Sequence, residues 1–246
     1  MKILQQGDAN LPWGFDLARY GTSGVDYISK FGFNPACGTS EEPIWAESGV
    51  SYTFPSVAQT MTVSSANAND TSAGTGARTI YIEGLDANYL PISETVALNG
   101  QTGVTLVNQY LRIHRAYILT AGSGGTNAGI VYVGYGNITA GKPATVQAHL
   151  VAGVAQSLLG YYTIPANRTG YLMNMHFVTN GKGEFLVYRR DYGGIFRVQR
   201  RLPVIDTIDI DFQIPLVLPS KTDFQVRGLA ATSTNKMGVT FDMVLT

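Results

Sequence analysis

Charged side chains are scarce in this sequence. Asp, Glu, Lys and Arg make up 14% of the 246 residues, whereas typical soluble domains have about 25%. The 17 basic and 17 acidic residues balance, so we expect no general attraction to nucleic acid or to acidic membranes. A surface of neutral polar groups suits contact between proteins, because little charge has to be desolvated. Many β-sandwiches share this composition, so it does not by itself indicate an interface.

Cysteine and long apolar runs are also missing. Cys37 is the single cysteine, which excludes a disulfide within the chain and a zinc site built from cysteines. The N-terminal residues lack the apolar stretch of about 7–15 residues that a signal peptide needs. No window approaches the ~18 apolar residues of a membrane helix. We therefore expect a protein that is made and kept in a cytoplasm, with no membrane partner.

The segment 1–48 has no hydrophobic period. Its apolar residues follow neither the alternation of a strand nor the spacing of a helix, and glycines and prolines interrupt it. It is nevertheless rich in aromatic residues, which a disordered tail would lack. We predict an extended, irregular N-terminal arm over 1–48 that packs on the body of the same chain or on a neighbouring subunit. The candidate contact residues are Trp13, Phe15, Phe31, Phe33 and Trp45.

Short runs typical of β-strands fill residues 49–246. Turns rich in Gly and Asn separate them, and none has the pattern of an amphipathic helix. We predict an all-β body over 49–246, an antiparallel β-sandwich of jelly-roll type, and leave open whether it is one sandwich or two. No fixed-period repeat points to a solenoid or a propeller. The expected strands are 59–64, 79–85, 92–98, 110–119, 130–135, 144–150, 170–177, 184–190, 195–201, 208–212, 224–227 and 239–243.

The run 110–119 alternates in polarity. Leu111 and Ile113 occupy every second position, and Arg112 and His114 lie between them. Because successive side chains of a strand point to opposite faces, this pattern predicts a dry face with the aliphatic residues and a wet face with the other two.

No residues form a recognisable catalytic or metal-binding pattern. His114, His149 and His176 are isolated in the sequence, and we expect them to be surface histidines or hydrogen-bonded core histidines. The glycine-rich loop 122–129 lacks the lysine and the following helix of a phosphate-binding loop. We therefore predict no catalytic residue, no cofactor and no metal, and we expect that the protein is not an enzyme.

Arginines are concentrated around the Gly193-Gly194 turn. The planar guanidinium group is weakly hydrated and suits interfaces, so one interpretation is a docking patch for an acidic partner. The other is internal pairing with Asp206, Asp209 and Asp211 on the following strand. The zero net charge and the lack of an aromatic stacking pattern argue against nucleic acid. The candidate residues are Arg189, Arg190, Arg197, Arg200 and Arg201.

A set of turn and strand motifs runs through most of the chain. The motifs are 30–35 followed by Trp45, 69–78, 84–89, 94–100, 121–129, 162–166 and 193–197. Together they resemble a group of mostly uncharacterised virion proteins of tailed bacteriophages. The resemblance implies a virion structural component with a β-sandwich body, assembled in the host cytoplasm. It does not indicate whether that component belongs to the head, neck or tail.

The leading hypothesis is a capsid-associated decoration, cement or head-fibre protein. It would be a homo-oligomer, anchored to other virion proteins by residues 1–48. The alternative is a tail, neck or baseplate component that binds a host receptor or glycan, for which the 14 tyrosines supply rings for sugar stacking. A glycan-degrading enzyme would need two carboxylates that face each other across a cleft, and nothing in the sequence pairs Asp86, Glu94 and Glu184.

Overall fold

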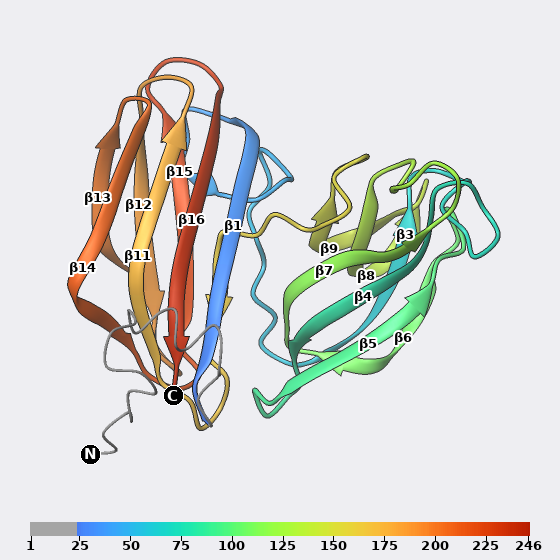
Figure 1. Cartoon of the computed structure of the whole chain (residues 1–246), viewed down its shortest axis with the longest axis horizontal. Coiled ribbons are helices and arrows are strands. Elements are labelled where there is room, and N and C mark those ends of the chain that lie inside the picture. Colours follow the sequence, from blue (N-terminus) through green and yellow to red (C-terminus); the bar gives the residue numbers. More distant parts are fainter. Residues whose placement is uncertain (1–23) are drawn as a thin grey trace, which may run out of the picture.

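A computed structural model describes residues 24–246, which form strands and loops without a helix in that range (Figure 1). The prediction of an all-β chain is confirmed, and all pairings between the strands of this range are antiparallel. The strands are β1 (Asp26–Cys37), β2 (Glu42–Pro43), β3 (Gln59–Ser65), β4 (Ala77–Leu85), β5 (Pro91–Ala97), β6 (Val104–Tyr110), β7 (Arg112–Ala121), β8 (Val131–Thr139), β9 (Lys142–Leu150), β10 (Tyr161–Thr163), β11 (Gly170–Thr179), β12 (Gly183–Arg190), β13 (Arg197–Val204), β14 (Thr207–Leu218), β15 (Asp223–Ala230) and β16 (Asn235–Leu245).

Strands from both ends of the described chain form the first sandwich, which we call the terminal sandwich. One of its sheets has the strand order β1-β16-β11-β14, and the other has the order β10-β15-β12-β13 with the short β2 beside β15. If the strands are numbered 1 to 8 along the chain without β2, these orders become 1-8-3-6 and 2-7-4-5. The first strand thus pairs with the eighth, the second with the seventh, the third with the sixth and the fourth with the fifth.

The chain between β2 and β10 forms a second sandwich, which we call the inserted sandwich. Its sheets have the orders β6-β3-β8-β9 and β5-β4-β7, and it lies to the right of the terminal sandwich in Figure 1. Two separate clusters of buried hydrophobic residues correspond to the two sandwiches. The body is therefore two sandwiches, and its division does not follow the predicted boundary at residue 48, because β1 and β2 share the terminal sandwich with β10–β16.

The expectation of an irregular arm is wrong for β1. This strand pairs with β16 from Asp26 to Cys37, with one irregularity near its end. Its inward residues include Ile28, Lys30 and Gly32, so the buried face has mixed polarity and no apolar alternation marks it in the sequence. Gly32 is required there, because a Cβ atom would lie 2.4 Å from the backbone of Gly160. Residues 1–23 lie outside the described range.

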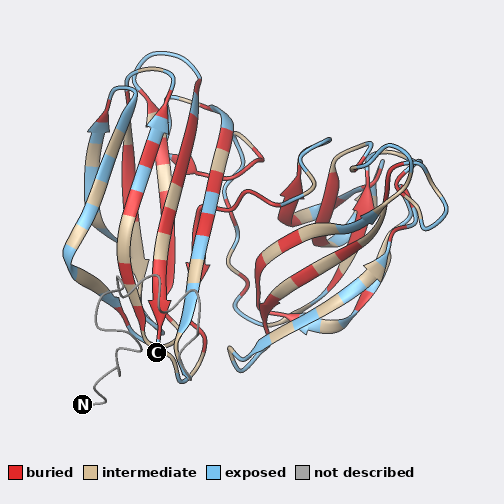
Figure 2. Cartoon of the chain, viewed as in Figure 1, coloured by how far each residue is buried: buried red, intermediate tan, exposed pale blue. Residues whose placement is uncertain are grey.

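Alternation elsewhere builds the two cores, as the buried stripes in Figure 2 show. In β16, Met237, Val239, Phe241 and Met243 all point inward and are fully buried. The ring of Phe241 packs edge-on against Phe224 of the facing sheet, with centroids 5.1 Å apart. Burial of side chains of this size contributes about 1.5–3 kcal/mol each, so these stripes fix which face of each strand is turned inward.

Asp70 organises the polar loop between β3 and β4. Its carboxylate is fully buried and accepts hydrogen bonds from the backbone N–H groups of Ala77 (2.7 Å), Ala128 (2.7 Å) and Gly129 (2.9 Å). The hydroxyl of Ser65 donates to it at 2.6 Å. One side chain thereby ties the loop to the glycine-rich loop that the sequence analysis excluded as a phosphate site.

We expect Asp70→Ala to lower the free energy of unfolding by about 3 kcal/mol, because it leaves one buried and two part-buried N–H groups without an acceptor. Asp86→Ala is the matched control, since Asp86 accepts from the N–H groups of Asn88 and Leu90 in an exposed turn. Urea denaturation measures both variants. Equal small losses for the two would show that Asp70 does not hold the loops.

Candidate interaction surfaces and the junction between the sandwiches

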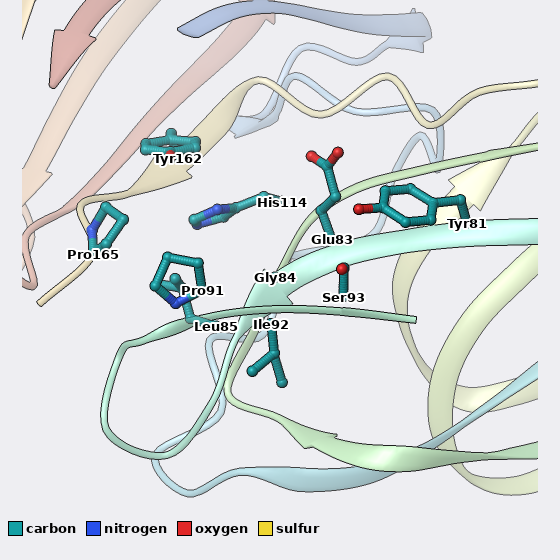
Figure 3. A pocket seen from close by; sticks show the side chains of 10 residues that line it. All are labelled: Tyr81, Glu83, Gly84, Leu85, Pro91, Ile92, Ser93, His114, Tyr162 and Pro165. Atoms are coloured by element: carbon teal, nitrogen blue, oxygen red, sulfur yellow. The ribbon is translucent and has the colours of Figure 1, made fainter. Parts of the chain in front are cut away.

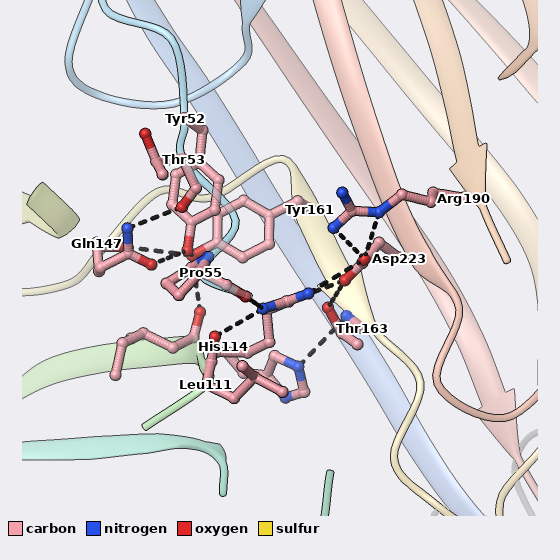
Figure 4. Close-up of polar contacts among 12 residues, drawn as sticks. Tyr52, Thr53, Pro55, Leu111, His114, Gln147, Tyr161, Thr163, Arg190 and Asp223 are labelled. Atoms are coloured by element: carbon pink, nitrogen blue, oxygen red, sulfur yellow. Dashed lines mark hydrogen bonds and ion pairs between the residues drawn. The ribbon is translucent and has the colours of Figure 1, made fainter. Parts of the chain in front are cut away.

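Asp223, at the start of β15, is the centre of a buried ionic cluster between the two sandwiches (Figure 4). Arg112 of β7 donates from Nε to Oδ1 at 2.9 Å and from Nη2 to Oδ2 at 3.2 Å. Arg190 of β12 donates from Nε and Nη2 to Oδ2 at 2.9 and 2.6 Å, and the Thr163 hydroxyl donates to Oδ1 at 2.6 Å. The side chains of Arg112 and Asp223 are only 3% and 4% exposed. Two guanidinium groups share one carboxylate, which leaves this cluster with a net positive charge.

A second buried network joins the same elements through hydroxyl groups. The Tyr161 hydroxyl of β10 donates to the carbonyl of Ile113 at 2.8 Å and lies 2.7 Å from the hydroxyl of Tyr52. Tyr52 in turn donates to Oε1 of Gln147 at 2.7 Å (Figure 4). Buried polar groups with full hydrogen bonding fix one arrangement of their surroundings, so this network restricts movement between the sandwiches.

Lys30 of β1 forms a third contact between the two sandwiches. Its ammonium group is buried and donates to the carbonyl of His114 in β7. Burial, together with the positive charge of Arg115, lowers the pKa of Lys30 to about 7, and the negative charge of Glu83 opposes the shift. Burial likewise lowers the pKa of His114 well below its ordinary value, and its Nε2 accepts from the N–H of Thr163 at 3.3 Å.

The prediction for 110–119 is wrong for its polar face. Arg112 and His114 are buried, as are Leu111 and Ile113. Ile113 lies in the core of the inserted sandwich, whereas contacts with the terminal sandwich cover Arg112 and His114. A second body of the same chain covers this face, and alternation within one strand cannot reveal that. The expectation that the histidines serve structural roles holds for His114, which also stacks on Tyr162 with ring centroids 4.0 Å apart.

A cavity of about 290 Å³ opens beside this contact. Figure 3 shows Glu83, His114 and Tyr162 around it, with Tyr81 and Ser93 nearby. His114 is held neutral by the lowered pKa and uses Nε2 as an acceptor. The cavity wall therefore has one carboxylate, that of Glu83, and an imidazole whose Nε2 already accepts a hydrogen bond. Glycan hydrolysis requires two carboxylates that face each other.

The three acidic residues considered for glycan hydrolysis are separated and structurally engaged. Asp86 accepts from backbone N–H groups in the β4–β5 turn, Glu94 accepts from the N–H groups of Val107 and Asn108, and Glu184 pairs with Arg201 at 2.6 Å. Within residues 24–246, no three His, Cys, Asp or Glu side chains are grouped as metal ligands. That range also contains no helix long and apolar enough to cross a membrane.

The predicted arginine cluster is divided between different roles. Arg190 belongs to the Asp223 cluster, Arg189 pairs with Asp191 at 2.6 Å and Arg201 pairs with Glu184. For Arg197 and Arg200, no ion pair occurs within residues 24–246.

The alternative of pairing with the following strand is also not realised among these residues. Asp209 lies beside His176, and Asp206 and Asp211 form no ion pair with the rest of the described chain. Arg197 and Arg200 of β13 and Asp211 of β14 therefore remain available to a partner. Arg201 and Asp209 are already engaged within the chain.

The predicted aromatic contacts fall in different places. Trp45 is buried in the core of the inserted sandwich, and its Nε1 donates to the carbonyl of Val50 at 3.0 Å, so it holds this chain together. Phe31 is exposed on β1 and stacks on the half-buried Phe33, with centroids 6.2 Å apart. Trp13 and Phe15 lie outside the described residues.

The two sides of the terminal sandwich differ. At the side of β1 and β10, the inserted sandwich covers the sheet edges through the contacts of Lys30, Tyr161 and Thr163. At the other side, β13 and β14 are edge strands of their sheets, and no element of residues 24–246 pairs with their outer edges. We call the surface of β13 and β14, with the turns that flank β13, the open side. Its exposed apolar residues are Ile195, Val198, Ile205, Ile214 and Val217.

Comparison with known proteins does not show a family. No protein-family model matches the chain, and no curated protein is similar to it in sequence. Solved structures of infectious bursal disease virus strains Gt and Gx align with 90% and 89% of this chain and with 72% and 71% of theirs. Their identities are 11% and 9%, and both TM-scores are 0.23. The VP2 subviral particle of that virus aligns at 9% identity and a TM-score of 0.19, over 90% of this chain and 72% of its own. TM-scores this low do not establish a shared fold.

Proposed function

We propose that this chain is a non-enzymatic structural protein of a virion, built on a jelly roll and attached to the capsid as a decoration, cement or head-fibre component. The strand order of the terminal sandwich carries the proposal. Its nested pairs, first with eighth through fourth with fifth, support a jelly roll, a two-sheet fold used by viral capsid and lectin domains. The phage motifs of the sequence point in the same direction, although a fold alone does not specify a function.

The join between the sandwiches suits a structural role. Arg112, Asp223 and Tyr161 link the inserted sandwich to the terminal one through buried polar contacts. A pair of domains that moved freely would instead share a small and more hydrated interface. The chain then acts as one rigid block that presents a fixed surface to its neighbours.

The open side supports assembly with other copies of this chain. Exposed apolar residues on edge strands favour contact with a partner, and Ile214 is 86% exposed. Pro203 in β13 and Pro215 in β14 lack the N–H groups that strand addition requires. The contact that these strands favour is therefore packing between side chains.

Charge makes a second copy the best partner for the open side. Arg197 and Arg200 lie on β13, whereas Asp209 and Asp211 lie on β14. A two-fold axis parallel to the strands at this side would place β13 of one copy next to β14 of the other, twice in each dimer. Basic and acidic side chains would then face each other in both contacts.

Anchoring to the capsid falls to a shorter segment than the sequence predicts. Residues 26–37 are a strand of the terminal sandwich and Trp45 is a core residue. The anchoring role proposed for 1–48 therefore applies to residues 1–23, which include Trp13 and Phe15.

We expect charge reversal on one strand of the open side to weaken self-association at least about tenfold. The test compares Arg197→Glu with Arg200→Glu, Asp209→Lys with Asp211→Lys, and the chain that carries all four changes, by sedimentation over a range of concentrations. Each pair of changes creates like-charge contacts, and the fourfold variant restores opposite charges. The control is Lys182→Glu with Lys236→Glu, which makes the same change in net charge as the arginine pair at exposed positions outside β13 and β14. A monomeric wild type, or a fourfold variant no better than the pairs, would contradict this interface.

The second candidate function is a tail, neck or baseplate component that recognises a host glycan. A pocket between the two sandwiches favours it, since aromatic rings and the ammonium group of Lys221, unpaired within residues 24–246, meet there.

A further inference from the structure

Turns from both sandwiches meet at a pocket of about 250 Å³ next to the Asp223 cluster. The inserted sandwich contributes Tyr89 from its β4–β5 turn. The terminal sandwich contributes Arg190 and Tyr192 at the end of β12, and Lys221 just before β15. The pocket shares the β12–β13 turn with the open side but none of its exposed apolar residues. Its size suits one sugar ring rather than a drug-sized ligand.

The ammonium group of Lys221 lies close to the rings of two tyrosines in this pocket. The Nζ atom of Lys221 lies 5.4 Å from the ring centre of Tyr89 and 4.9 Å from that of Tyr192. The two rings are perpendicular, with centroids 5.7 Å apart. Tyr192 is 66% exposed, so much of its side chain is accessible to a ligand. Lys221 forms no ion pair within residues 24–246.

The backbone at Tyr89 and Lys221 has an uncommon conformation. Tyr89 and Lys221 have φ angles of 64° and 62°, in the left-handed region that residues other than glycine rarely adopt. Backbone contacts fix both turns, because Ala166 N–H donates to the Tyr89 carbonyl at 2.8 Å and Lys221 N–H donates to the Ile164 carbonyl at 3.0 Å. Strained residues persist where the surroundings over-determine them, and they cluster at binding sites.

The charges around the pocket favour an anion. Arg190 uses Nε and Nη2 on Asp223, and its Nη1 has no hydrogen-bond partner in the described residues. Asp191 on the rim is already paired with Arg189, which lowers the pKa of Asp191. Lys221 and the free edge of Arg190 are therefore the cationic donors that remain for a ligand.

We propose that this pocket binds an acidic sugar residue, that is, a pyranose that carries a carboxylate. The carboxylate would accept from Lys221 and from Nη1 of Arg190, as charge-assisted hydrogen bonds. The apolar face of the ring would pack on Tyr192, as flat C–H surfaces do on aromatic rings. A free phosphate would use the cations but leave the ring of Tyr192 without a contact, so a carboxylated sugar matches more of the site. This proposal is independent of the proposed role in assembly, so either proposal can be wrong while the other holds.

The test measures binding of two probes, oligogalacturonate and the α-methyl glycoside of N-acetylneuraminic acid, by titration calorimetry and ligand-observed NMR. We expect a dissociation constant of about 1 mM for a single small site, and affinity that falls as salt is added. Tyr192→Ala and Lys221→Gln should each weaken binding at least tenfold. Both side chains are at the surface, so the variants should fold, and thermal unfolding checks this. Lys182→Gln is the matched control and should bind as the wild type does.

Neutral and peptide ligands complete the experiment. Maltotetraose, which has no carboxylate, should bind at least tenfold more weakly than the acidic probes. No binding of either acidic probe at 10 times the expected dissociation constant, or binding that Lys221→Gln leaves unchanged, would overturn the proposal. Equal or tighter binding of a short poly-glutamate peptide would overturn the sugar assignment and indicate an acidic protein partner.

Discussion

Asp223→Asn should lower the free energy of unfolding by about 4 kcal/mol. The substitution keeps the shape of the side chain and removes its charge, which leaves two guanidinium groups without a counter-ion. Arg112 suffers most, because its side chain is 3% exposed and water cannot replace the lost carboxylate. Breaking a buried pair from one side costs far more than the pair itself contributes, since an uncompensated charge remains.

Urea denaturation measures this loss, and Asp191→Asn provides the control. Asp191 also pairs with an arginine, but its side chain is 50% exposed, so we expect a loss below about 1 kcal/mol. The double variant Asp223→Asn with Arg112→Met should recover part of the stability, because it removes the stranded charge. A loss for Asp223→Asn as small as that of the control would show that the ionic cluster does not hold the two sandwiches together.

Lys30→Met should stabilise the protein by about 3 kcal/mol at pH 6. The pKa of Lys30 is about 7 in the folded chain against 10.5 for an ordinary lysine. Between these values the unfolded chain binds more protons than the folded chain, so the wild type becomes more stable as the pH rises through this window. Below pH 7 the full cost of burying the charge is present. Methionine avoids that cost but loses the hydrogen bond to the His114 carbonyl, which reduces the gain.

The pH dependence distinguishes this mechanism from a general packing effect. The difference in unfolding free energy between Lys30→Met and the wild type should change by about 4 kcal/mol from pH 6 to pH 10 and favour the wild type at the upper end. Titrating groups away from Lys30 contribute equally to both proteins and cancel in the difference, whereas His114 is coupled to Lys30, whose charge lowers the pKa of His114. Lys182→Met, at an exposed position, should show a difference that is independent of pH. A constant difference for Lys30→Met would mean that Lys30 is not a buried, destabilised cation.

Strands with regular alternation could be predicted from the sequence. The runs that became β3, β4, β9, β11 and β12 alternate or are flanked by Gly and Asn turns, and their predicted bounds lie within those observed. β1 was missed because Lys30 and Gly32 occupy its buried face. Their environment comes from β7 and from the Gly160 backbone, which are distant in sequence.

The ionic cluster and the pocket could not be predicted from the sequence, because their residues are distant from one another along the chain. Arg190 was a candidate, but its partner Asp223 is 33 residues away, and a lone aspartate before a strand gives no sign of two arginines. Tyr89 and Lys221 come from different sandwiches, and only the fold brings them together. The arginine-rich and acidic strands were visible as adjacent runs. Their position on two edges of one open side depends on the sheet order, which local patterns do not encode.

The most direct test of the proposed structural role is electron cryo-microscopy of particles of the virus that, under this proposal, encodes this chain, with and without its gene. We expect purified wild-type particles to contain regular density on the capsid that fits the two joined sandwiches, and particles without the gene to lack it. Density lost at the tail or neck would keep the virion role, discard attachment to the capsid and favour the glycan-binding alternative. If purified wild-type particles did not contain the protein, the proposal that it is a virion component would be contradicted.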